Sequence, residues 1–139
     1  MVKAPRHIPD ALRDAQTRAS DPRSSAFVSA NAGSGKTHVL VQRVIRLLLD
    51  GVPPEKILCL TFTKAAAANM AERVFTTLGQ WVTLDDAALD RAIGAVGIPH
   101  PGSKLRKEAR KLFASALETP GGLKVQTIHA LCTRLLQQF

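Results

Sequence analysis

Apolar residues follow two spacings along the chain, and these spacings alternate. Segments with an apolar residue every three or four positions predict amphipathic helices, whereas short apolar runs predict strands. We expect helices over Ile8–Ala19, Gly35–Leu49, Lys64–Leu78, Asp85–Ala95, Ser103–Leu117 and Ile128–Phe139. We expect strands over Ser25–Ala30, Lys56–Thr61 and Leu123–Thr127, the second of them buried. Strands that alternate with helices favour an α/β fold in which helices flank a parallel sheet.

The segment between the first strand and its helix carries the strongest chemical signal, Ala30-Asn31-Ala32-Gly33-Ser34-Gly35-Lys36-Thr37. Its glycines let backbone N–H groups curl around phosphate oxygens, and the helix N-terminus adds a partial positive charge. Lys36 would reach the β- and γ-phosphates, and the Thr37 hydroxyl would coordinate Mg²⁺. A plain glycine turn is the alternative, but it leaves Gly-Lys-Thr at the helix start unexplained. We therefore expect ATP and Mg²⁺ as cofactors, with Lys36 and Thr37 as catalytic residues.

The charge balance favours a polyanionic partner, because 19 Lys and Arg residues face 11 Asp and Glu residues, a net charge of +8. Neutralised phosphates release counterions, so a basic surface favours nucleic acid, although many basic domains bind none. No apolar run approaches the roughly 20 residues that span a bilayer, and the N-terminus lacks a secretory signal. We expect a cytoplasmic protein with no membrane partner. Cys59 and Cys132 sit in apolar patterns and are expected to be small buried side chains.

The phosphate loop has Ala30 where most such loops have Gly, and the string from Ser29 to Thr37 thereby resembles UvrD/Rep-type superfamily 1 helicases. The resemblance implies a P-loop NTPase (RecA-like) fold and an ATP-dependent DNA helicase or translocase. It implies nucleotide contacts from the whole loop and from His38, which follows it. It also assigns Gln16 to the adenine edge, where an amide offers a donor and an acceptor together. An ordinary exposed helix glutamine is the alternative for Gln16.

Two further segments resemble DNA-contacting motifs of the same family. Thr61-Phe62-Thr63-Lys64, continued as far as Met70, is similar to motif Ia, where hydroxyls and a helix N-terminus can donate to a phosphate and Phe62 can stack on a base. The alternative there is a strand end with a core phenylalanine. Thr127-Ile128-His129 is similar to the T-F-H motif, and Ile128 in place of Phe removes a stacking role. The threonine and histidine can still meet single-stranded DNA, although a lone histidine is more often structural.

The spacing narrows the resemblance. Glu118–His129, and the stretch that starts at Leu78-Gly79-Gln80-Trp81, look like the AddA-type subunit of bacterial double-strand-break-repair helicase–nucleases. The chain is then the N-terminal part of the helicase ATP-binding motor domain (1A), with a helical insertion around 79–119. The resemblance implies single-stranded and double-stranded DNA as substrate, an AddB-like partner subunit, and a role in DNA repair and recombination. Trp81 is expected in the core or in an interface.

The carboxylates that hydrolysis needs are not visible in the chain. In the family they read D-E-x-Q after the motif at Thr127–Cys132, and the chain stops at Phe139 before them. Asp85 and Asp86 end an apolar run, as such a strand would, but a helical pattern continues beyond them. We interpret them as helix-start acids rather than metal ligands. We expect an incomplete motor domain that binds nucleotide weakly and does not turn it over.

The basic helix over Ser103–Leu117 has two open interpretations. Ser103 is expected to cap it, and Leu105, Ala109 and Leu112 are expected to form its buried stripe. Cations cover the rest, namely Lys104, Arg106, Lys107, Arg110 and Lys111. A solvated helix face is favoured, and the alternative is contact with duplex DNA or with a partner subunit.

Two other protein classes stay open at this stage. A different P-loop enzyme, such as a small kinase, would share the loop but would not need Phe62 or His129 near DNA. A nucleic-acid-binding module with a vestigial P-loop would bind DNA without nucleotide. Titrations with single-stranded DNA and with nucleotide separate these classes from a helicase.

Overall fold

The computed structural model describes residues 7–31, 35–120 and 122–139. Its elements are α1 (Asp10–Ala19), α2 (Lys36–Leu49), the 3-10 turn η1 (Pro54–Lys56), β1 (Leu58–Thr61), α3 (Lys64–Thr83), α4 (Asp86–Ala95), α5 (Ser103–Glu118), β2 (Lys124–Thr127) and α6 (Ile128–Gln137). Every predicted helix is present, and α3 runs past its predicted end because its buried spacing continues to Trp81. Helices with a parallel pair of strands confirm the α/β class.

The strand predicted over Ser25–Ala30 is wrong. The segment has no regular structure and is exposed, with Phe27 95% exposed. A strand needs a neighbour to pair its backbone groups, and β1 pairs instead with β2. Ala26 and Val28 lie over a small hollow against α2, so the segment follows that helix rather than a sheet edge.

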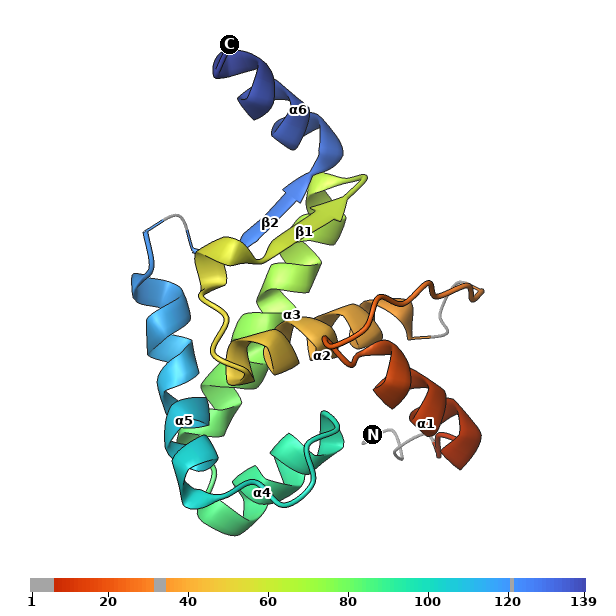
Figure 1. The fold of residues 1–139 in the computed structure, drawn as a ribbon, viewed down its shortest axis with the longest axis vertical. Coiled ribbons are helices and arrows are strands. Elements are labelled where there is room, and N and C mark those ends of the chain that lie inside the picture. The colour runs from red at the N-terminus through yellow and green to blue at the C-terminus, as the bar shows by residue number, and fades with distance from the viewer. Residues whose placement is uncertain (1–6, 32–34, 121) are drawn as a thin grey trace, which may run out of the picture.

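The sheet places two strand ends side by side. β1 and β2 are parallel, with Leu58 opposite Lys124 and Thr61 opposite Thr127. The connection between them passes through α3, α4 and α5, as a parallel crossover requires. Consequently α3 and α6 both begin at the C-terminal ends of the two strands, on the same side of the sheet, as Figure 1 shows.

The expectation of a buried strand at Lys56–Thr61 is wrong for one of its faces. Leu58 and Leu60 are 48% and 44% exposed, whereas Cys59 is half-buried against the core. Successive side chains of a strand point to opposite faces, and α3 covers only one face of this strand. The other face of β1 is apolar and open.

The core lies mainly among α2, α3, α4 and α5. Its fully buried side chains include Ile45, Val74, Leu78, Leu89 and Ile93. Trp81 is 3% exposed, which confirms its predicted place in the core. The stripe predicted on α5 is confirmed in part, since Ala109 is fully buried and Leu105 and Leu112 are half-buried.

The two terminal helices contribute little to that core. Neither α1 nor α6 contains a buried residue, and Figure 1 shows both reaching away from the central helices. Cys132 on α6 is exposed, so its predicted burial is wrong; its neighbours on α6 are mostly exposed as well. Among the described residues no helix is long and apolar enough to cross a membrane.

The predicted helix starts have mixed outcomes. Asp85 is the N-cap of α4, where its Oδ1 accepts from the Ala88 N–H at 2.7 Å. Ser103 is not the cap of α5: Gly102 occupies that position and gives no side-chain hydrogen bond.

Candidate nucleotide site and strand-end surface

The phosphate loop leads into α2 at Lys36. Gly35 is the N-cap residue with φ of 89°, a left-handed conformation that glycine adopts without a steric cost. The Lys36 ammonium donates to the Ala30 carbonyl oxygen at 2.8 Å, so it joins the two ends of the loop. The predicted contacts of Ala32, Gly33 and Ser34 fall outside the described residues.

The first turn of α2 suits an anion. Helix N-termini present N–H groups without intrahelical partners, and the helix dipole adds positive charge there. Within the described residues no side chain caps α2. Thr37 is half-buried in this turn, whereas Asn31 before it and His38 within it are exposed. The polar groups expected to meet phosphate and Mg²⁺ therefore share one end of α2.

The predicted adenine-reading residue lies at the same place. A Cβ added at Gly35 would stand 2.8 Å from Gln16 Nε2, so the amide of α1 lies directly against the N-cap of α2. Gln16 is half-buried. The structure thus brings Gln16 of α1 to the N-cap of α2, from which it is distant in the sequence.

Arginines of α2 hold α1 in this position, and sequence reasoning missed them. Arg43 donates to three backbone carbonyls at the end of α1 and in the turn after it, and Arg46 donates to the Thr17 carbonyl oxygen at 3.0 Å. They follow the loop in a helix with apolar spacing and match no motif. Nothing local in the sequence indicates that their partners are carbonyl groups of another helix.

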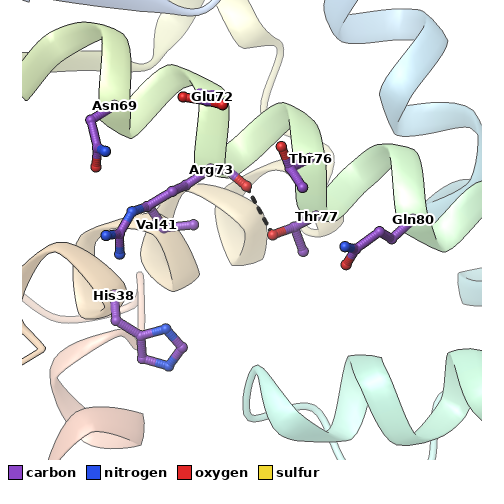
Figure 2. A pocket seen from close by; sticks show the side chains of 8 residues that line it. All are labelled: His38, Val41, Asn69, Glu72, Arg73, Thr76, Thr77 and Gln80. Carbon is purple, nitrogen blue, oxygen red and sulfur yellow. Dashed lines mark hydrogen bonds between the residues drawn. The ribbon is translucent and has the colours of Figure 1, made fainter. Parts of the chain in front are cut away.

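A polar groove lies between α2 and α3 and reaches the turn that carries His38. Figure 2 shows the Arg73 side chain directed from α3 toward the turn of α2 that carries His38. The groove has a volume of about 500 Å³, and its lining is His38, Val41, Asn69, Glu72, Arg73, Thr76, Thr77 and Gln80. Glu72, Arg73, Thr76 and Thr77 lie past the end of the motif Ia match, so the sequence did not single them out.

The predicted DNA-contacting threonines meet at the strand ends. Thr61 lies opposite Thr127 across the sheet. The hydroxyl oxygens of Thr63 and Thr127 cap α3 and α6, each accepting a backbone N–H at 3.1 Å. A capping hydroxyl accepts, so the O–H of the exposed Thr63 stays able to donate to a phosphate, whereas Thr127 is buried, with 8% of its surface exposed. The Thr61 hydroxyl donates to the Thr63 carbonyl oxygen at 2.9 Å, so its single donor is already used.

The remaining residues of these motifs face outward. Phe62 is 86% exposed, so the alternative of a core phenylalanine is wrong. Lys64 and His129 are exposed as well. An exposed aromatic ring beside capping hydroxyls and a cation has the chemistry of a surface for a single nucleic-acid strand.

The two adjacent acids at the start of α4, Asp85 and Asp86, make contacts that stabilise the fold. Asp86 accepts from Arg110 at 2.8 Å, and this hydrogen bond lowers the pKa of its carboxyl group. Arg106 lies 3.8 Å from the same carboxylate and also pairs with Asp90. The described residues contain no cluster of three metal-ligating side chains. Asp85 caps α4 and Asp86 lies in its first turn, so both are helix-start acids, as predicted.

These ion pairs separate the cations of α5 into two groups, those that contact α4 and those that are exposed. Arg106 and Arg110 are directed to α4, whereas Lys104 and Lys107 are exposed. Lys111 is exposed and lies 3.9 Å from Glu108 on its own helix. Part of this helix's charge is thus used within the chain, in keeping with a largely solvated face.

A helicase motor domain is the class that this site and sheet suggest, and the comparison with protein families agrees. The family described as the UvrD/REP helicase N-terminal domain matches residues 12–139. The chain belongs to this family.

Within this family, the chain is similar to a set of curated proteins that share one name. An ATP-dependent helicase/nuclease subunit from Levilactobacillus brevis is 39% identical over 116 residues, which is 84% of this chain and 8% of that protein. Proteins of the same name from Desulfitobacterium hafniense and Desulforudis audaxviator are 34% and 37% identical, over 90% and 81% of this chain. Each alignment covers 8% of the relative, so the chain spans a small part of these proteins. No solved structure matches the chain.

Proposed function

We propose that this chain is the ATP-binding part of the first motor domain (1A) of a DNA helicase, with a helical insertion around 79–119. One observation carries the proposal: the Gln16 amide lies against Gly35, the N-cap of the helix that begins at Lys36. A base-reading amide and a phosphate-binding helix start then occupy one site. The family match supports a P-loop NTPase (RecA-like) fold around it.

In this site the loop from Ala30 to Thr37 wraps the phosphates of ATP. The Lys36 ammonium exchanges the Ala30 carbonyl for a phosphate oxygen, and the Thr37 hydroxyl contributes to Mg²⁺ binding. His38 and the groove toward α3 border the nucleotide. Mg²⁺ supplies charge neutralisation at the phosphates when bound.

Single-stranded DNA crosses the edge where β1 and β2 end. Phe62 stacks on a base, and the Thr63 hydroxyl, Lys64 and His129 contact the backbone. The buried Thr127 caps the helix that carries His129. The names of the relatives support a whole protein that acts as an ATP-dependent helicase and nuclease on DNA. We propose that it works in double-strand-break repair in the cytoplasm, with an AddB-like partner subunit.

Nucleotide titration tests this function. We expect Mg²⁺–ATP to bind the 139-residue chain, and we expect Lys36→Ala to weaken binding at least about tenfold because it removes the charge that faces the phosphates. Lys56→Ala, an exposed lysine of η1, is the matched control and should bind as the wild-type chain does. Equal affinities for the wild type and Lys36→Ala would contradict the proposal.

A DNA titration separates a helicase from the other open classes. A small kinase would bind nucleotide but not single-stranded DNA. A module with a vestigial loop would bind DNA but not nucleotide. The helicase assignment requires both, with Lys36→Ala losing nucleotide and keeping DNA.

A further inference from the structure

The C-terminal end of α1 is held almost entirely by polar contacts. The helix buries no residue of its own, so apolar packing does little to fix it. The last carbonyl groups of a helix have no intrahelical partners and need donors from elsewhere. Two arginines on α2 supply these donors.

Arg43 contacts the last residue of α1 and the turn that follows it. Its guanidinium donates to the carbonyl oxygens of Ala19 at 3.1 Å, Asp21 at 2.8 Å and Ser24 at 2.6 Å. A planar guanidinium can serve several acceptors at once, which a lysine ammonium on its flexible stem does less well. Arg43 therefore holds the end of α1 and its turn against α2.

Arg46 contacts α1 next to Gln16 itself. It is 7% exposed, and it donates to the Thr17 carbonyl oxygen at 3.0 Å and to Ser20 Oγ at 3.2 Å. Its guanidinium also lies 3.7 Å from the carboxylate of Asp21. Since Thr17 follows Gln16 directly, this contact fixes the backbone that carries the amide.

The chain that follows α4 packs closely against Arg46 at Gly97. A Cβ at Gly97 would stand 2.9 Å from an Arg46 guanidinium nitrogen and 3.0 Å from a Thr17 methyl group. Gln42 Nε2 donates to the Ala95 carbonyl oxygen at 3.3 Å, which holds that end of α4 against α2. Arg46 is thus enclosed between α1 and α4 and has little room to move.

We propose that Arg43 and Arg46 are positioning residues that hold Gln16 beside Gly35 and thereby set the base selectivity of the nucleotide site. This inference rests on the proposed function, in which Gln16 reads the adenine edge. The hydrogen bonds of both arginines go to α1 and to the turn that follows it. They act through α1, so their loss should affect recognition of the base and leave recognition of the phosphates unchanged.

The test compares three ligands, ATP and GTP with Mg²⁺ and inorganic tripolyphosphate, by calorimetry on the 139-residue chain. The variants are Gln16→Ala, Arg43→Met, Arg43→Lys and the double variant Gln16→Ala/Arg43→Met. Arg91→Met, an exposed arginine of α4, is the matched control. Circular dichroism checks that each variant folds, and if Arg43→Met does not fold, Arg43→Lys decides.

We expect Gln16→Ala and Arg43→Met each to reduce the preference for ATP over GTP about three- to tenfold, the value of one or two lost hydrogen bonds. The double variant should lose no more than Gln16→Ala alone, because both act on one contact. Arg43→Lys should fall between Arg43→Met and the wild type. Affinity for tripolyphosphate should not change.

Two results would overturn the inference and leave the phosphate site standing. One is an unchanged ATP-to-GTP ratio in Arg43→Met and Arg43→Lys, and the other is a wild-type chain that binds triphosphates without any base preference. A wild-type chain that binds neither ATP nor tripolyphosphate would instead overturn the proposed function itself.

Discussion

Gly35 occupies the point at which the residues of the proposed site meet. It combines a left-handed φ with an amide nitrogen of Gln16 2.8 Å from where a Cβ would be. Either constraint alone favours glycine. Together they explain why the helix start and α1 can approach each other so closely.

Gly35→Ala should therefore lower the free energy of unfolding by about 1–2 kcal/mol, the cost of a left-handed alanine, and should displace the Gln16 amide. Urea unfolding measures the first effect. Gly94→Ala is the matched control, since nothing lies within 4 Å of its added Cβ and α4 gains a better helix former. The explanation is wrong if both variants are equally stable.

Phe62 is the most testable residue of the strand-end surface. Phe62→Ala should weaken binding of a single-stranded oligonucleotide by roughly tenfold, because stacking of one base is worth about 1–3 kcal/mol. Fluorescence anisotropy measures this. Phe27→Ala removes a ring that is just as exposed but lies before the phosphate loop, and it should leave DNA affinity unchanged. Equal losses in the two variants would indicate nonspecific apolar contact.

Sequence reasoning at the residue scale succeeded where burial follows from residue type and failed where a contact is long-range. The contact of Lys36 with the phosphates of ATP stays a prediction, and in the structure its ammonium donates to the Ala30 carbonyl. Trp81 was predicted in the core and is buried there. Arg43 and Arg46 were missed because their acceptors are backbone carbonyls, which look the same for every residue type.

At the scale of elements, helices were easier to predict than strands. The helix α3 could be predicted because its apolar residues recur about one turn apart, a pattern that is local in the sequence. A strand depends on a neighbour that sequence spacing does not reveal. Ser25–Ala30 has a strand-like composition, yet in the described chain it has no strand beside it and stays irregular. The predicted cap of α5 was also wrong, because Gly102 is the N-cap and Ser103 is already the first residue of the helix.

The pairing of α4 with α5 makes stability depend on pH. Arg110 hydrogen-bonds the Asp86 carboxylate and holds its pKa below the ordinary value of 3.8. A carboxyl group with a lowered folded-state pKa stabilises the fold above its unfolded pKa, and this contribution disappears as the pH falls through the folded pKa. The free energy of unfolding should thus decrease as the pH is lowered from about 5 to below 3.8.

Asp86→Asn isolates this contribution. The variant should be less stable than the wild type at about pH 7, and the difference should shrink toward zero in acid, as followed by urea unfolding at several pH values. Asp14→Asn removes an exposed carboxylate of α1 and serves as the control for net charge. A difference that stays constant with pH would rule out the Arg110 pair as its cause.

At the scale of the whole molecule, we expect the chain to bind nucleotide without hydrolysing it. The sequence contains no D-E-x-Q string, and its adjacent acids are used by the Ala88 N–H and by Arg110. The 139-residue chain should therefore release no phosphate from Mg²⁺–ATP, with or without single-stranded DNA. A colorimetric phosphate assay measures this, and turnover stimulated by DNA would refute it.

The central claim is that the loop before α2 and the amide of Gln16 bind one nucleotide. A two-dimensional ¹H–¹⁵N NMR titration of the chain with Mg²⁺–ATP tests it directly. We predict the largest shifts at the backbone amides of residues 30–38 and at the Gln16 side-chain amide, all lost in Lys36→Ala. Shifts that are scattered over the surface, or that persist in Lys36→Ala, would contradict the account.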